Sequence, residues 1–130
     1  MKTALSPVAE LSFDESESIL YVKMIQDAAL NLVSAKQHGI QIEELTEGKP
    51  YMALIDTTNF FTIDDEALKY AGIPSKLEKR IAAAYYNPDL ANWLTVKVFK
   101  RTSGLAFPVQ IFKTKEKAVE WLSSFKNQDL

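Results

Sequence analysis

The segment 51–56, Tyr-Met-Ala-Leu-Ile-Asp, constrains the fold of this 130-residue chain most strongly. Its run from Met52 to Ile55 is apolar on both faces of a strand, which is typical of a parallel strand covered by helices on both sides. Three consecutive acids, Asp64, Asp65 and Glu66, follow after a short turn and lie in the first turn of a helix that includes residues 66–70. The segment therefore predicts a buried strand, a turn and a helix with an acidic start.

The rest of the chain alternates between strand-like and helix-like segments. Residues 11–13 and 19–25 predict a hairpin, because apolar and polar side chains alternate from Leu20 to Met24 and the segment between them is polar. A helix is predicted from a cap at Asp27 to a stop at Gly39. The residues of 81–86 fit either a helix or a strand, and the new helix start at Asn87 and Pro88 favours a strand. The other expected elements are a cap at Thr62 or Asp64 for the second helix, a helix over 87–102, a strand over 107–112 and a helix from a cap at Thr114 to about 125.

This order, β-β-α-β-α-β-α-β-α, indicates an α/β fold. We expect a mixed, mostly parallel sheet flanked by helices, with right-handed crossovers and one antiparallel hairpin at its start. Residues 1–10 are expected to form a loose N-terminal lead-in, because Ser6-Pro7 interrupts any regular element. Residues 11–126 are expected to form a single domain.

Composition limits the function classes. The chain is 47% hydrophobic and 25% charged, which is ordinary for one soluble globular domain. It contains no cysteine, so disulfides, thiol catalysis and cysteine-based zinc sites are excluded. A net charge of −2 provides no field to recruit nucleic acid. Apolar runs are far too short to span a bilayer and no signal peptide is recognisable, so we expect a cytoplasmic protein.

Charge is distributed unevenly along the chain. Residues 43–66 contain seven acids and a single base, whereas residues 97–117 contain six bases and a single acid. This pattern fits two solvated surfaces, and it also fits a bipolar surface suited to self-association as a homodimer.

The residues do not predict an enzyme. His38 is the only histidine, and beside Gly39 it is expected to cap a helix C-terminus. A phospho-accepting reading would use Asp56, Lys113 and Asp27 at strand ends, as in response-regulator receivers, but the adjacent acidic pair that holds Mg²⁺ is missing. We predict no catalytic residue, no metal site and no cofactor.

Two pieces of the chain resemble a known fold family. The first is Leu54-Ile-Asp56 followed by Ile63-Asp-Asp-Glu-Ala-Leu68. The second is Arg80-Ile-Ala-Ala-Ala-Tyr, then 90–99, then the run from Phe107 to Leu122 with its Ala-x-x-Trp-Leu helix. Together they resemble the SpoIIAA-like fold of STAS domains and anti-sigma-factor antagonists, over roughly 11–125. The tail resembles uncharacterised bacterial STAS-like families more closely still.

The resemblance implies a regulatory binding domain without its phosphorylation switch. Asp64 matches the antagonists' Asp, Asp65 their first Ser, Glu66 the phosphorylated Ser and Ala67 the Gly that follows. Because neither 65 nor 66 has a hydroxyl group, a kinase has no acceptor there. The acids can simply complement the helix dipole, or they can present permanent negative charge to a protein partner.

A second binding hypothesis uses the helix over 87–102. Its aromatic and basic residues are compatible with docking to an apolar ligand or a membrane surface; they are Trp93, Lys97, Phe99, Lys100 and Arg101. The sequence therefore predicts a non-enzymatic, STAS-like protein-binding domain that contacts Asp64, Asp65 and Glu66, with lipid or apolar-ligand binding as the alternative.

Overall fold

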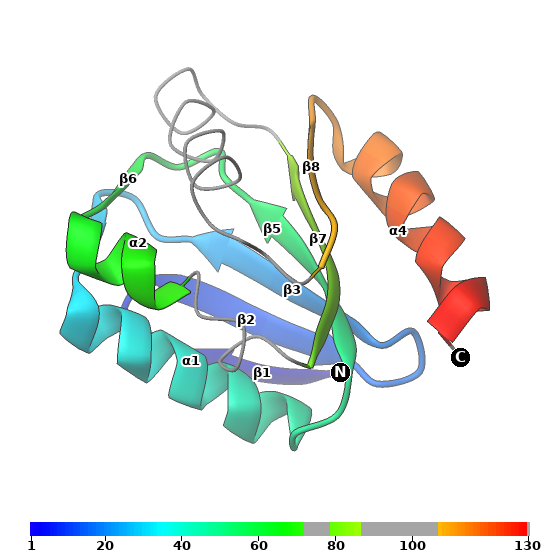
Figure 1. The fold of residues 1–130 in the computed structure, drawn as a ribbon, viewed down its shortest axis with the longest axis horizontal. Helices are drawn as coiled ribbons and strands as arrows, with labels where there is room; N and C mark the ends of the chain where they lie inside the picture. The colour runs from blue at the N-terminus through cyan, green and yellow to red at the C-terminus, as the bar shows by residue number, and fades with distance from the viewer. Residues whose placement is uncertain (72–78, 87–106, 130) are drawn as a thin grey trace.

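The protein is an α/β domain whose sheet is mixed and mostly parallel, with helices on both sides (Figure 1). The computed structural model describes residues 1–71, 79–86 and 107–129. The strands are β1 Lys2–Leu5, β2 Ala9–Asp14, β3 Ile19–Met24, β4 Ala28–Leu30, β5 Tyr51–Asp56, β6 Phe61–Ile63, β7 Arg80–Tyr86 and β8 Val109–Phe112, and the helices are α1 Leu32–Thr46, α2 Asp65–Ala71 and α4 Lys115–Asp129.

The main sheet has the order β1-β2-β3-β5-β7-β8. Its first three strands are antiparallel neighbours, and β3, β5, β7 and β8 run parallel. The predicted hairpin and the predicted parallel strands are therefore confirmed. The strand interpretation of 81–86 is also confirmed, since β7 lies between β5 and β8.

The order of the parallel strands determines where the helices lie. From β3 through β5 to β7 each new parallel strand is added on the same side, and a right-handed crossover from β3 to β5 places α1 on one face. Ile42 and Leu45 of α1 accordingly pack on one face of the sheet. Among the described helices, α4, which follows the last strand, packs on the other face through Ala118 and Leu122.

The first helix differs from its prediction at both ends. Residues expected in its first turn form β4, which pairs with β6 in a separate two-stranded parallel sheet. The cap is Asn31, whose side chain accepts from the backbone N–H of Ser34 while the Ser34 side chain accepts from the backbone N–H of Asn31. The helix continues through Gly39 and ends at Glu47, whose φ of 54° is left-handed. The cap at Asp27 and the stop at Gly39 were therefore wrong.

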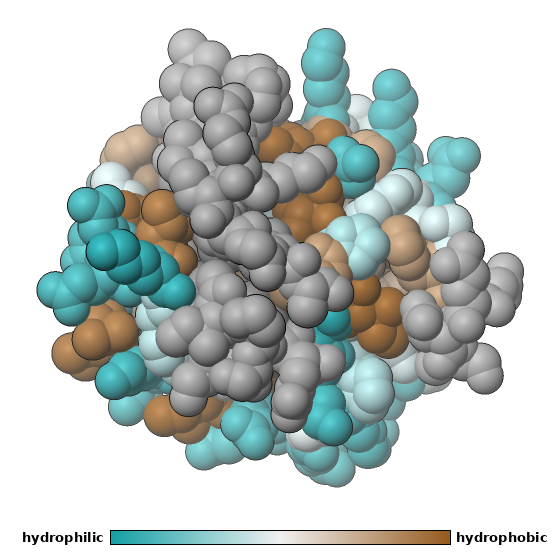
Figure 2. All heavy atoms as spheres, in the orientation of Figure 1, coloured by the Kyte–Doolittle hydropathy of each residue, from teal (hydrophilic) through white to brown (hydrophobic). Residues whose placement is uncertain are grey.

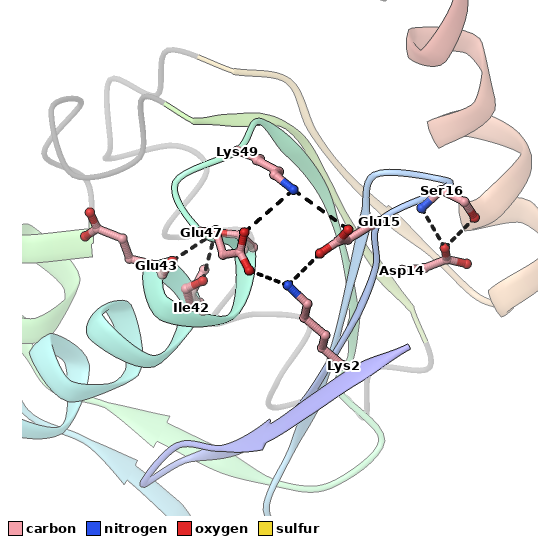
Figure 3. A network of polar contacts seen from close by, with 9 residues as sticks. Lys2, Asp14, Glu15, Ser16, Ile42, Glu43, Glu47 and Lys49 are labelled. Carbon is pink, nitrogen blue, oxygen red and sulfur yellow. Dashed lines mark hydrogen bonds and ion pairs between the residues drawn. The ribbon is translucent and has the colours of Figure 1, made fainter.

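The N-terminal lead-in is also corrected. Residues 2–5 form the edge strand β1, which pairs with β2. Ion pairs tie its start to neighbouring elements (Figure 3): Lys2 Nζ lies 2.6 Å from Glu15 in the β2–β3 turn and 2.5 Å from Glu47 at the end of α1. These groups are exposed, so the pairs hold the edge in place without adding much stability.

The caps of the two later helices agree with their predictions. Asp64 Oδ1 accepts from the N–H of Ala67 at 2.9 Å, and Thr114 Oγ1 accepts from the N–H of Lys117 at 3.3 Å. The predicted helix over 87–102 lies outside the described residues. None of the helices that the structure describes is long and apolar enough to cross a membrane.

Candidate functional site

An open half of the sheet is the main candidate site. Helix α4 packs on β5, β7 and β8, and its Lys115 reaches over Tyr21 of β3. Among the described parts of the chain, no helix packs on the same face of β1 and β2. A groove of about 490 Å³ lies there. Its size falls within the range of ligand-binding clefts.

Two rows of side chains that cross the strands line this groove. Because side chains of one face recur at every second residue, paired residues of neighbouring strands form rows across the sheet. The strand registers give one row of Thr3, Ser12, Tyr21 and Leu54, and a second row of Leu5, Glu10, Lys23, Asp56 and Tyr86. All nine of these residues line the groove. We call these the hydroxyl row and the charged row.

The dimensions of the rows limit what the groove can hold. Five strands spaced about 4.8 Å apart extend the charged row over about 19 Å. Residues two apart on a strand are separated by about 7 Å, which is the distance between the two rows. The two rows therefore outline a strip of the sheet about 19 Å long and about 7 Å across.

Tyr86 and Asp56 close one end of the charged row. Burial raises the pKa of the Tyr86 phenol to about 12, together with the charge of Asp56 and a hydrogen bond to it. The other partners of that carboxylate are in the following turn, since Asp56 Oδ1 accepts from Thr58 N–H at 2.9 Å and from Thr58 O–H at 2.6 Å. The carboxylate is therefore fixed at the carboxyl end of β5.

Tyr21 provides the aromatic surface of the hydroxyl row. Partial burial raises the pKa of its phenol, and the carboxylates of Asp14 and Glu17 add to the effect. The Lys115 ammonium, from the first turn of α4, lies 5.6 Å from the centre of the ring. This side chain is thus already in contact with one cation, in the geometry of a cation–π interaction.

The acidic junction that the sequence predicts lies at the start of α2. Asp64 is the cap of this helix, and its backbone N–H donates to Leu30 O at 3.0 Å. Asp65 and Glu66 follow in the first turn and are exposed. The structure thus gives Asp64 a structural role and leaves Asp65 and Glu66 facing solvent.

His38 is not at a helix end. It lies within α1, where its Nδ1 is 2.8 Å from Ser6 Oγ. Ser6 Oγ also accepts from the N–H groups of Val8 at 3.2 Å and Ala9 at 3.0 Å. With both lone pairs so used, the hydroxyl hydrogen has two acceptors within reach, His38 Nδ1 at 2.8 Å and Ala9 O at 3.4 Å. The shorter contact assigns the hydrogen to Nδ1, and with it the neutral tautomer of His38 that carries hydrogen on Nε2. The predicted C-terminal cap was wrong, because α1 continues beyond Gly39.

A guanidinium group lies near this histidine within the α1-side core. Arg80 stacks on the rings of Tyr51 and Phe107, with its Cζ at 5.5 and 5.8 Å from the ring centres. Its Nε donates to the Tyr51 hydroxyl at 3.3 Å. Burial, and secondarily the charge of Arg80, lowers the pKa of His38 to about 4. These contacts form part of the core, in contrast to the solvent-accessible groove on the other face.

The remaining predicted residues are placed as follows. Asp56 lies in the groove, where its carboxylate accepts hydrogen bonds from Thr58 and Tyr86 and is not part of an acidic cluster. Among residues 1–71, 79–86 and 107–129, no three His, Asp or Glu side chains form a group that could hold a metal ion. The alternative interfacial residues lie outside the described residues; they are Trp93, Lys97, Phe99, Lys100 and Arg101.

Sequence reasoning missed most of the groove residues. The alternation of Tyr21 and Lys23 with buried neighbours did mark one polar face of β3. No local pattern joins Leu5 or Glu10 to Tyr86, because their proximity depends on the register of five strands.

The chain belongs to a protein family whose function is unknown. A family model described as "Domain of unknown function (DUF7793)" matches residues 13–126. No curated protein and no solved structure matches the chain. The match begins near the end of β2 and ends within α4, so it covers the groove strands β3, β5 and β7 and leaves out β1 and the groove residues Glu10 and Ser12 of β2.

Proposed function

We propose that this chain is a non-enzymatic binding domain that acts through protein–protein interaction. The observation that carries the proposal is the groove on the open half of the sheet. Within the described ranges no helix packs on this face of β1 and β2, and the two rows of side chains offer hydroxyl, charged and aromatic groups in one concave site. This combination suits recognition of another chain.

The resemblance to STAS domains and the cytoplasmic location stay predictions. The expected elements that the structure describes occur in the expected order; strands β1, β4 and β6 were not expected, and the predicted helix over 87–102 lies outside the described residues. The exposed Asp65 and Glu66 fit a permanently acidic junction. A partner that read this junction would contact the α1–α2 side of the sheet. A partner in the groove would contact the other side, so the two surfaces can be tested separately.

The test is position-specific photo-cross-linking in cells of the organism that encodes the chain. A benzoylphenylalanine would replace Thr3 in the groove, Glu66 at the junction, or Val33, which is 74% exposed on α1. We expect a discrete adduct from Thr3 and none from Val33. An adduct from Glu66 alone would move the contact to the junction. No adduct at any position, or equal adducts at all three, would refute the proposal.

The alternative function, binding to an apolar ligand or a membrane surface, has a separate test. The groove favours a polar occupant, because Glu10, Lys23 and Asp56 line one side of it. On the face seen in Figure 2, hydrophobic patches near α1 are interrupted by hydrophilic atoms and do not form one continuous apolar surface. We therefore expect no co-flotation with anionic vesicles, and flotation that is lost in Lys97→Glu would support the membrane alternative.

A further inference from the structure

The groove combines features that select its occupant by shape and by charge. Its charged row is about 19 Å long, which corresponds to about six extended residues. A compact small molecule would use only part of that length. These dimensions favour a peptide segment that crosses the strands.

The charges around the two tyrosines are predominantly negative. Each phenol lies near two carboxylates, Asp14 and Glu17 for Tyr21, and Asp56 and Glu116 for Tyr86. Burial is the main reason that the pKa of both phenols is raised, and these carboxylates raise it further. Together with Glu10 in the lining, the four carboxylates outnumber the ammonium groups of Lys23 and Lys115 beside them.

The aromatic surface of the groove also suits a cation. Lys115 shows how an ammonium group approaches the ring of Tyr21. Lysine and arginine side chains are attracted both to such rings and to fixed carboxylates. In the charged row, Lys23 lies between Glu10 and Asp56, so it opposes a basic occupant while its two neighbours attract one.

Building on the proposed function, we propose that the groove binds an extended segment of a partner protein through lysine or arginine side chains. In this arrangement the segment lies between the hydroxyl row and the charged row. Its basic side chains approach Asp56 and Glu10, and the rings of Tyr21 and Tyr86 contact its stems. A segment without basic residues would make van der Waals contacts with the groove but would lack the attraction to its carboxylates.

The test uses three fluorescent octapeptides in which alanine alternates with lysine, glutamine or glutamate. We expect the full chain to bind the lysine peptide about fivefold tighter than the glutamine peptide at low salt, and the glutamate peptide most weakly. Added salt should reduce the difference. Amide chemical shifts should change in β1, β2 and β3, and not in α1.

Substitutions of opposite sign separate a charge effect from a folding defect. Asp56→Asn and Glu10→Gln should each weaken binding of the lysine peptide by about two- to fivefold, whereas Lys23→Gln should tighten it by a similar factor. The matched control is Glu66→Gln, an exposed acid outside the groove, which should change nothing.

Two results would overturn the inference: equal binding of the lysine and glutamine peptides, or equal weakening by Glu66→Gln and Asp56→Asn. If Thr3 still cross-links a partner in either case, the proposed function stands and only the preference for basic segments is wrong. If no position cross-links a partner, both fail together, and an adduct from Glu66 alone rejects the groove as the binding site while a protein contact remains at the junction.

Discussion

The part-buried pair of Ser6 and His38 makes the stability of the protein sensitive to mild acid. His38 has a pKa of about 4 in the folded chain, below the ordinary value of 6.5. The unfolded chain therefore takes up a proton at a higher pH than the folded chain. The contribution of neutral His38 to stability is complete above a pH of about 6.5 and is lost as the pH falls toward 4.

The magnitude follows from the two pKa values. The difference between the ordinary His38 pKa of 6.5 and its folded-state pKa of about 4 corresponds to a maximum loss of roughly 3 kcal/mol in the free energy of unfolding. Between pH 7 and pH 5, where most carboxylates stay ionised, the expected loss is about 2 kcal/mol. Protonation at Nδ1 would also remove the bond from the Ser6 hydroxyl, whose lone pairs are occupied by Val8 and Ala9.

The assay is urea unfolding at constant ionic strength at pH 7, 6 and 5, with NMR titration of the imidazole carbon-bound protons. Since the chain has one histidine, those signals are unambiguous. His38→Gln should be less stable at pH 7 and should show little change in stability between pH 7 and 5. A measured pKa of 6 or above for His38 in the folded protein would refute the reasoning, as would an equal pH dependence in the variant.

Three further predictions concern packing, capping and the junction. Leu122→Ala should lower the free energy of unfolding by about 2–5 kcal/mol, because Leu122 is fully buried between α4 and the sheet. The exposed control Val33→Ala should change it by less than about 0.5 kcal/mol, and chemical denaturation measures both. Asp64→Ala should cost about 1 kcal/mol through loss of the α2 cap, and a larger cost for Asp65→Ala would contradict the assigned roles. Glu66→Lys should leave the circular dichroism spectrum unchanged and weaken capture of a partner that reads the junction; unchanged capture would remove the junction from consideration.

Much of the fold was predictable because its signals are local. The apolar run of β5 and the alternation in β3 report burial over a few residues, and Thr114 marks the start of α4 by its side-chain chemistry. The correct cap of α1 was also visible, since Asn31 and Ser34 have the spacing of a reciprocal cap. Asp27 obscured it, because it suits a cap equally well.

The candidate site was much less predictable. Asp65 and Glu66 were expected to be exposed at a helix start, and they are. The groove required the pairing of β1 with β2 and the position of α4, and neither follows from a local pattern. Strand β4 was missed for the same kind of reason, since Ala28–Leu30 is a strand only because Phe61–Ile63 lies beside it.

The sequence by itself determined the alternation of strands and helices, the absence of cysteine chemistry and the acidic start of α2. Those properties depend on side-chain type and on short spacings along the chain. The tertiary structure decided on which part of the sheet α4 packs, which side chains form the hydroxyl and charged rows, and why His38 resists protonation. Each of these depends on residues far apart in sequence, whose contacts are set by strand register and by the direction of the crossovers.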